Sequence, residues 1–374
     1  MGGLDGALSG LLVADFGRVL AGPYATMLMA DLGADVIKIE RPGSGDDTRS
    51  WGPPHANGTA TYFLGVNRNK RSIALDLRDP SDLEVAKALV ARADVLVENF
   101  KPGTMDRLGL GYPAMRALNP ALVYCSVTGF GSGKGADLPG YDLVVQAVGG
   151  LMSVTGEPGG HGTKTGVALV DVITGLHAAL GVLAALRHRD RTGEGQRVEV
   201  SLLTSLLSAL TNQAAAYAAA GEVATAMGNR HPSIVPYEVF AAADRPIVIA
   251  AGNDRQFRAL CAVLDRPELA ADARYATNAG RVAGRDELVP SLAEALAQGT
   301  ADHWFTVLTE AGVPCGPIND LADAFALADR LGLEPLAGDQ VANPVRMSAT
   351  PAAYRLPPPD LGQDEQWVRD ILDR

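Results

Sequence analysis

The stretch "LLVADFGRVLAGPYATMLMADLGADVIKIE", residues 11–40, decides the fold class of this chain. Residues 11–16 form an apolar run of strand length, and residues 22–33 have the pattern of a helix that ends at a glycine. Residues 34–40 are rich in β-branched side chains and predict a second strand. A strand, a helix and a strand in this order predict a βαβ unit, in which the two strands run parallel.

The same alternation continues beyond this unit. Strands are predicted at residues 70–77, 94–100 and 121–130, with a helix at residues 80–93. Strands that alternate with helices favour a mostly parallel sheet with helices on both faces. The sequence therefore predicts an α/β fold.

The second half of the chain contains two long apolar segments. Residues 166–186 are barely long enough to span a membrane, and the polar residues Asp171, Thr174 and His177 interrupt their apolar sequence. We interpret this segment as a buried helix, and residues 201–220 as a second, Ala- and Leu-rich helix. A chain of 374 residues favours two domains, and clusters of Gly, Pro and polar residues after the second helix indicate a boundary.

The composition excludes several classes of protein. A net charge of -11 argues against a protein that binds the nucleic-acid backbone. Three cysteines without CxxC spacing favour neither a disulfide framework nor a zinc site, which fits a reducing cytoplasm. The first residues, "MGGLDGALSGLLVADF", lack the basic and apolar regions of a signal peptide. We expect a cytoplasmic protein without nucleic-acid or membrane partners.

Common nucleotide and hydrolase motifs are incomplete. The first strand is followed by Gly17 and Gly22 only, so the GxGxxG pattern of dinucleotide binding is absent. Near Lys134, Thr128 occupies the glycine position of a P-loop. Neither GxSxG nor HExxH occurs, which argues against triad hydrolases and zinc proteases. The glycine-rich residues 129–140 are either a lid or a flexible surface connection.

Asp171 is the unusual residue of the apolar segment, because a carboxylate among apolar side chains is costly unless it is compensated. In the predicted helix it lies at or near the first turn, where free N–H groups and the helix dipole favour an anion. It is therefore either a structural N-cap or a desolvated, pre-oriented nucleophile. Composition does not decide between these interpretations.

Several long segments resemble one known family. They occur in unbroken order and include "DFGRVLAGPYATMLMADLGADVIKIERPGSGDDTRSWGPP", "VLVENFKPGTMDRLGLGY", "PGYDLVVQAVGGLMSVTGEP" and "VALVDVITGLHAALGVLAALRHRDRTGEGQ". On these residues the chain closely resembles the class III CoA-transferases, the CaiB/BaiF family, over nearly its whole length.

The resemblance implies roles for individual residues. Asp171 would be the nucleophile that attacks an acyl-CoA thioester. The residues that would bind the CoA ester are Arg18, Leu20, Ala21, Arg41, Leu75, Arg78, Asn99, Phe100, Lys101, Arg107 and Tyr141. Gly252 and Asn253 would form a mobile loop over the active-site carboxylate, and the candidates for holding the acceptor acid are Arg230, His231 and Ser233. Coenzyme A is then a substrate, and neither a tightly bound cofactor nor a metal is expected.

The resemblance also implies the architecture. A large Rossmann-like domain would comprise residues 1–200 and 336–374, and a smaller α/β domain residues 225–315. A linker helix at residues 201–224 and a return linker at residues 316–335 would join them. Two copies of the chain would interlock as a homodimer.

The expected reaction moves CoA from succinyl-CoA to a dicarboxylate such as glutarate. One alternative is a 2-methylacyl-CoA racemase of the same family, but Tyr141 stands where the racemases have a histidine, and a phenol with a pKa of about 10 is a poor acid/base catalyst. A second alternative is formyl-CoA:oxalate CoA-transferase, in which a glutamine stands in place of Leu20. A third alternative is a CoA-ester binding protein without turnover.

Overall fold

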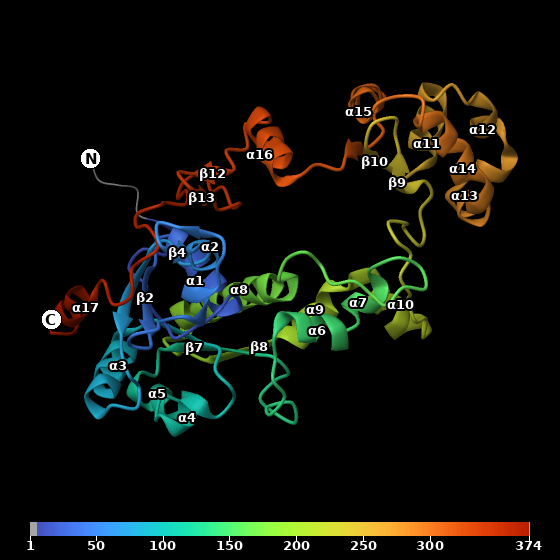
Figure 1. Cartoon of the computed structure of the whole chain (residues 1–374). Coiled ribbons are helices and arrows are strands. Elements are labelled where there is room, and N and C mark those ends of the chain that lie inside the picture. Colours follow the sequence, from blue (N-terminus) through green and yellow to red (C-terminus); the bar gives the residue numbers. More distant parts are fainter. Residues whose placement is uncertain (1–5, 374) are drawn as a thin grey trace. The chain divides into compact units, whose positions relative to one another are not determined.

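A six-stranded sheet is the centre of the larger of two compact units in the computed structural model, which describes residues 6–373 (Figure 1). Its strands lie in the order β5-β2-β1-β6-β7-β8, and every neighbouring pair is parallel. The strands are β1 (Leu12–Asp15), β2 (Asp35–Glu40), β5 (Lys70–Ala74), β6 (Val95–Glu98), β7 (Val123–Thr128) and β8 (Arg197–Ser201). The predicted α/β fold with a parallel sheet is confirmed.

The strand order places a change of direction between β1 and β6. The chain first builds β1, β2 and β5 towards one edge, and then returns to the other side of β1 for β6, β7 and β8. This is the order of the doubly wound Rossmann fold, in which ligands bind beyond the carboxyl ends of the strands at that point. The loops after β1 and β6 are therefore the first place to look for a site.

Helices cover both faces of the sheet. On one face, α1 (Ala21–Asp31) and α8 (Leu169–Thr192) pack against buried valines of β1, β6 and β7. On the other face, α3 (Pro80–Arg92), α5 (Tyr112–Leu118) and α17 (Glu365–Leu372) enclose a second apolar core (Figure 1). The central strands are buried on both sides, which explains their continuous apolar sequence.

The segment predicted as a single helix at residues 201–220 is divided. Residue 201 ends strand β8, and Ser201 then caps α9 (Leu202–Ala209) through its side chain. Thr211 has a left-handed φ of 38°, and α10 (Thr211–Ala220) starts a new helix there. The single-helix prediction was wrong because Ala- and Leu-rich composition does not reveal a break at one residue.

The remaining elements of this part of the chain are short and connect the main ones. They are η1 (Asp47–Ser50), β3 (His55–Ala56), β4 (Thr59–Ala60), α2 (Thr61–Leu64), α4 (Thr104–Arg107), α6 (Asp142–Val148), α7 (Leu151–Val154), β12 (Leu336–Ala337) and β13 (Gln340–Val341).

By length and composition, α8 is a described helix that could cross a membrane. In the structure it packs along the sheet, and Val170, Ala178 and Val182 lie in the core. The helix ends where Gly193 takes a left-handed φ of 77°, a common way to end a helix. The prediction of a core helix is confirmed.

The C-terminal segment completes the larger unit. The side chain of Asn69 binds the backbone N–H groups of Arg355 and Leu356, and the N–H of Ser72 donates to Asp364. Asn343 donates to the buried carboxylate of Asp31 on α1. Residues from both ends of the chain therefore build this unit.

The smaller unit comprises Ser153–Thr163 and Ala224–Leu333 and has its own apolar core. Its antiparallel sheet has the order β11-β10-β9, with β9 (Tyr237–Ala241), β10 (Pro246–Ala250) and β11 (Cys315–Pro317). The helices of this unit are α11 (Asp254–Val263), α12 (Pro267–Ala271), η2 (Ala273–Tyr275), α13 (Asn278–Ala283), α14 (Arg285–Leu296), α15 (Ala301–Glu310) and α16 (Leu321–Arg330).

Candidate active site

A cavity of about 430 Å³ lies at the carboxyl ends of β1, β6 and β7. The loop after β1 and the loop after β6 form two of its walls, and Asp171 at the start of α8 forms another. The lining residues include Arg18, Val19, Leu20, Ala21, Asn99, Phe100, Lys101, Tyr141 and Asp171. Seven of the residues proposed from sequence to bind the CoA ester thus lie around the same cavity as Asp171.

A second cavity, of about 370 Å³, lies next to the first, and Arg18 and Phe100 line both. Arg41, Leu75 and Arg78 also line this second cavity. The guanidinium group of Arg18 lies 5.2 Å from the centroid of the Phe100 ring, a cation–π distance. Two adjoining cavities of this size suit a long ligand that has a nucleotide at one end and a reactive group at the other.

Arg107 lies outside the lining of both cavities. It donates a hydrogen bond of 3.0 Å to the hydroxyl of Thr104, and Thr104 lines the second cavity. Arg107 therefore contacts a residue of the cavity wall but does not line the cavity itself.

Asp171 lies in the first turn of α8, and only 9% of its surface is exposed. Burial, and to a smaller degree the negative charge of Asp142, together raise the pKa of this carboxyl from 3.8 to about 7. A carboxylate with a pKa near neutrality is a stronger base than an ordinary aspartate and is still ionised in a large fraction of molecules at pH 7. These properties suit a nucleophile.

Asp142, and not Asp171, caps the start of α8. The helix has Ala168 at its N-cap position, without a side-chain bond. The Oδ1 atom of Asp142 accepts hydrogen bonds from the N–H groups of Val170 (2.8 Å) and Asp171 (3.1 Å), and its Oδ2 atom accepts one from Gln146 (2.6 Å). The interpretation of Asp171 as a structural N-cap is therefore wrong.

Close packing brings α8 against the first turn of α1. A Cβ atom added to Gly175, one turn after Asp171, would lie only 2.7 Å from the carbonyl oxygen of Ala21 and 3.1 Å from the ring of Tyr24. A larger residue at position 175 would therefore push α8 away from α1. The glycine allows Asp171 to face the Arg18–Ala21 loop.

Tyr141 and the glycine-rich loop form a further wall of the first cavity. Tyr141 directly precedes α6, and 60% of its surface is exposed. The two ends of the loop, Gly129 and Gly140, approach so closely that a Cβ atom on Gly129 would lie 2.7 Å from the Cα atom of Gly140. These two glycines are thus required by close backbone contact.

The candidate acceptor residues belong to the smaller unit. Arg230 lies 3.7 Å from the buried carboxylate of Glu238, and the ring nitrogen Nδ1 of His231 accepts a hydrogen bond from the N–H of Ser233. Gly252 and Asn253 form the turn before α11, and the Asn253 side chain caps that helix. In this structure Arg230, His231 and Ser233 are close together, and their role in binding an acceptor stays a proposal.

Comparison with known proteins decides the family. The family model "CoA-transferase family III" matches residues 8–365. The chain is 45% identical over 376 residues to a mouse protein named succinyl-CoA:glutarate CoA-transferase, with 98% of this chain and 86% of that protein covered. The chain belongs to CoA-transferase family III.

Two further relatives support this result. An Acetobacter aceti protein named acetyl-CoA:oxalate CoA-transferase is 45% identical, and the match covers 86% of this chain and 83% of that protein. The crystal structure of a CAIB/BAIF family protein from Brucella suis superimposes with a TM-score of 0.88 at 42% identity, and covers 99% of this chain and 100% of that one. The resemblance found in the sequence is confirmed: the protein is a class III CoA-transferase.

Sequence reasoning missed two residues close to the candidate nucleophile of this CoA-transferase. Asp142 directly follows Tyr141 in "PGYDLVVQ", but the resemblance assigns a role to Tyr141 alone. Burial raises the pKa of Tyr62, and the charges of Asp171, Asp142 and Asp46 raise it further, so the Tyr62 hydroxyl lies within electrostatic range of the site. The unusual carboxylate after a tyrosine could have identified Asp142, whereas no local signal marks Tyr62.

Proposed function

We propose that this CoA-transferase moves CoA from succinyl-CoA to a dicarboxylate such as glutarate, with Asp171 as the nucleophile. The observation that carries the proposal is the buried Asp171 carboxylate, which faces a cavity at the switch point of a Rossmann-like sheet. Within residues 6–373, only burial and the charge of Asp142 perturb this carboxylate, and no hydrogen-bond donor contributes, so its oxygens are available for attack.

The first half of the reaction loads CoA onto the enzyme. An ionised Asp171 oxygen attacks the thioester carbonyl of succinyl-CoA, and the C–S bond breaks to give an aspartyl–succinyl anhydride and CoA thiolate. The thiolate then attacks the aspartyl carbonyl, which releases succinate and leaves an aspartyl-CoA thioester. The apolar side chains next to Asp171, among them Leu20 and Val172, favour these steps because they keep water from the anhydride and leave the carboxylate poorly solvated.

The second half repeats these steps with the acceptor. The acceptor carboxylate attacks the aspartyl-CoA thioester and forms a second anhydride, again with release of CoA thiolate. The thiolate attacks the acceptor carbonyl, the new acyl-CoA leaves, and Asp171 is regenerated as a carboxylate. Because each half ends with the release of one product, the kinetics are ping-pong.

The two cavities support an assignment for the CoA ester. In this proposal the nucleotide end binds in the second cavity, against Arg41, Leu75 and Arg78, and the thioester end lies against Leu20, Ala21 and Asp171. Asn99, Phe100, Lys101 and Tyr141 line the passage to the thioester. Guanidinium groups suit the phosphates of the nucleotide, and they supply local positive charge in a protein whose net charge is -11.

The relatives support a dicarboxylate as the acceptor. The mouse glutarate transferase matches nearly the whole chain, and the oxalate transferase matches a smaller part of it. Arg230, His231 and Ser233 are our candidates for binding the distal carboxylate, with Gly252 and Asn253 as a mobile cover. The racemase alternative is less favoured because Tyr141, an exposed tyrosine, replaces the expected histidine.

We further infer the assembly and compartment. The side chains of Leu176, Leu180 and Leu183 on α8 are exposed within one chain, although they are apolar. A second copy that interlocks with the first, through linkers at residues 201–224 and 316–335, would cover such a face. Three free cysteines fit a reducing cytoplasm.

The transfer reaction is tested directly by product analysis. Enzyme with succinyl-CoA and glutarate is expected to form glutaryl-CoA with ping-pong kinetics. The same enzyme with a 2-methylacyl-CoA in D2O is expected to incorporate negligible α-deuterium, because Tyr141 is a poor proton acceptor near neutral pH. Mass spectrometry of the CoA esters measures both results. Fast deuterium exchange without CoA transfer to any of several dicarboxylates would favour the racemase.

The nucleotide assignment is tested with two arginine variants. Arg41→Ala is expected to raise KM for succinyl-CoA about tenfold, because it loses a charge-assisted contact remote from the thioester, and Arg107→Ala, whose side chain reaches the second cavity through Thr104, is expected to raise KM by a smaller factor. Turnover at saturation should change little. Arg116→Ala, an exposed arginine on α5, is the matched control and should leave KM unchanged. A normal KM in both variants would show that the nucleotide binds elsewhere.

A further inference from the structure

Val19 has a backbone conformation that is unusual for its side chain. Its φ is 66°, in the left-handed region that β-branched residues rarely adopt. The residue lies in the loop between β1 and α1 and lines the cavity that contains Asp171. Such strain persists only where surrounding contacts hold it, and it often marks a functional site.

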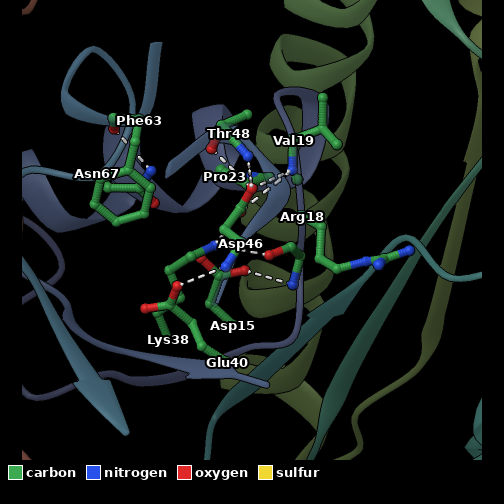
Figure 2. Close-up of polar contacts among 12 residues, drawn as sticks. Asp15, Arg18, Val19, Pro23, Lys38, Glu40, Asp46, Thr48, Phe63 and Asn67 are labelled. Carbon is green, nitrogen blue, oxygen red and sulfur yellow. Dashed lines mark hydrogen bonds and ion pairs between the residues drawn. The ribbon is translucent and has the colours of Figure 1, made fainter. Parts of the chain in front are cut away.

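A buried ion pair between Lys38 and Asp46 binds the backbone of the loop that contains Val19 (Figure 2). The backbone N–H of Val19 donates to both carboxylate oxygens of Asp46, at 3.3 Å each. The Nζ atom of Lys38 donates to the carbonyl oxygen of Gly17 and to Oδ2 of Asp46, both at 2.8 Å. The side chains of Lys38 and Asp46 are completely buried.

Further contacts fix the carboxylate of Asp46 itself. Oδ1 of Asp46 accepts hydrogen bonds from the N–H and the hydroxyl of Thr48, and the N–H of Asp46 donates to Glu40. Burial raises the pKa of Asp46, but the attraction of Lys38 and these hydrogen bonds outweigh it and hold the pKa below its usual value. The pair therefore stays ionised and rigid.

The strained conformation shapes the wall around Asp171. Val19 packs with Leu20 in an apolar cluster that also contains Ala168 and Val172, which lie on either side of Asp171. If Val19 relaxed to an ordinary φ, its N–H would leave Asp46 and its side chain would leave this cluster. The cavity would then admit water next to Asp171.

We propose that the Lys38–Asp46 pair is a positioning device that holds Val19 in its left-handed conformation and so keeps the apolar wall closed around Asp171. The proposal rests on the role of Asp171 as nucleophile. Lys38 and Asp46 both border the second cavity, but their side chains have no exposed surface, so neither acts on the reacting atoms. Their effect on the reaction is to favour attack on the aspartyl anhydride by CoA thiolate over attack by water, which would give succinate and regenerate the Asp171 carboxylate without transfer.

The ratio of hydrolysis to transfer tests this role. Asp46→Asn keeps the shape of the side chain but removes its charge. We expect kcat for CoA transfer to fall about tenfold, and the ratio of succinyl-CoA hydrolysed to CoA transferred to rise about tenfold. Because Asp46 borders the second cavity, CoA affinity is measured by calorimetry beside the hydrolysis ratio, and a loss of CoA affinity without a change in that ratio would assign the pair to nucleotide binding and overturn the proposal. Hydrogen exchange of the amides of residues 17–20 should become faster in the free enzyme.

Two further variants separate positioning from general stability. Asp31→Asn disturbs another buried pair of the same unit, in which Asp31 accepts hydrogen bonds from Arg68, Asn69 and Asn343. It is expected to lower thermal stability but to leave the hydrolysis ratio and the exchange of residues 17–20 unchanged. Should Asp46→Asn not fold, the double variant Lys38→Met/Asp46→Asn removes both charges with little change in volume and supplies the same measurements.

Val19→Gly gives the decisive comparison. Val19→Gly removes both the strained conformation and the side chain that the pair positions, so adding Asp46→Asn should cost less than about a further threefold in kcat when residue 19 is glycine. An equal cost in both backgrounds, or lower stability with an unchanged hydrolysis ratio, would overturn the proposal. Failure of the nucleophile assignment is seen separately, because Asp171→Ala would then still transfer CoA.

Discussion

Asp171→Ala is expected to abolish CoA transfer, with a loss in kcat of at least about a thousandfold. The loss is this large because the side chain forms the covalent bond to both the acyl group and CoA, and no other group can replace it. Binding of CoA should stay close to that of the unchanged enzyme, because the proposed nucleotide contacts lie in the second cavity. Steady-state kinetics and calorimetry measure the two effects.

A second variant at this position separates chemistry from folding. Asp171→Asn should be equally inactive but more stable above pH 7, by on the order of 1–2 kcal/mol, because it removes a carboxylate whose ionisation burial disfavours. The pKa of Asp171 is raised from 3.8 to about 7 on folding, so the unfolded chain loses its proton first as pH rises. The stability of the unchanged enzyme therefore falls between these pH values, and the difference from Asp171→Asn should vanish below pH 4. Transfer activity within tenfold of the unchanged enzyme in either variant would remove Asp171 from the nucleophile role.

Asp142→Ala is expected to lower kcat by between about tenfold and a hundredfold, because the N–H groups of Val170 and Asp171 lose their acceptor and the first turn of α8 loosens. Asp142→Asn retains an acceptor oxygen for these groups but is neutral. It should keep most of kcat. The contrast between the two variants separates the cap from the charge.

The same pair of variants changes the pH dependence. In the unchanged enzyme, kcat/KM for succinyl-CoA should fall below pH of about 7, because the nucleophile is the ionised form of Asp171. The negative charge of Asp142 contributes to the raised pKa, so Asp142→Asn should move this acid limb to lower pH. Kinetics between pH 4.5 and 8.5, with about half-unit steps, measure the shift. An acid limb that stays in place would show that burial alone sets the pKa.

The position of the site follows from the strand order of the larger unit. The loops after β1 and β6 separate because the chain turns to opposite edges of the sheet there, and Arg18 and Asn99 then join them through two hydrogen bonds of 2.8 and 2.7 Å. Both residues were predicted from the sequence as CoA contacts. Their mutual bonding was not, since it joins loops that are far apart in the chain.

The sequence by itself determined the local features. Apolar runs of strand length predicted β1, β2, β5, β6 and β7, and the interrupted apolar run predicted α8 with Asp171 in its first turn. It failed at β8, where polar residues alternate with apolar ones at the sheet edge. Periodicity reports the local burial of a segment, which is why central strands and a core helix were visible.

Only the tertiary structure decided how the site is held together. Asp142 caps α8 although it precedes Asp171 by 29 residues in the sequence. Asp46 accepts a hydrogen bond from the N–H of Val19, which precedes it by 27 residues. The left-handed conformation of Val19 contradicts the preference of its own side chain, so no local pattern predicts it. Contacts between distant segments depend on which groups are brought together when the elements pack, and a buried ion pair can then outweigh the conformational preference of a single residue.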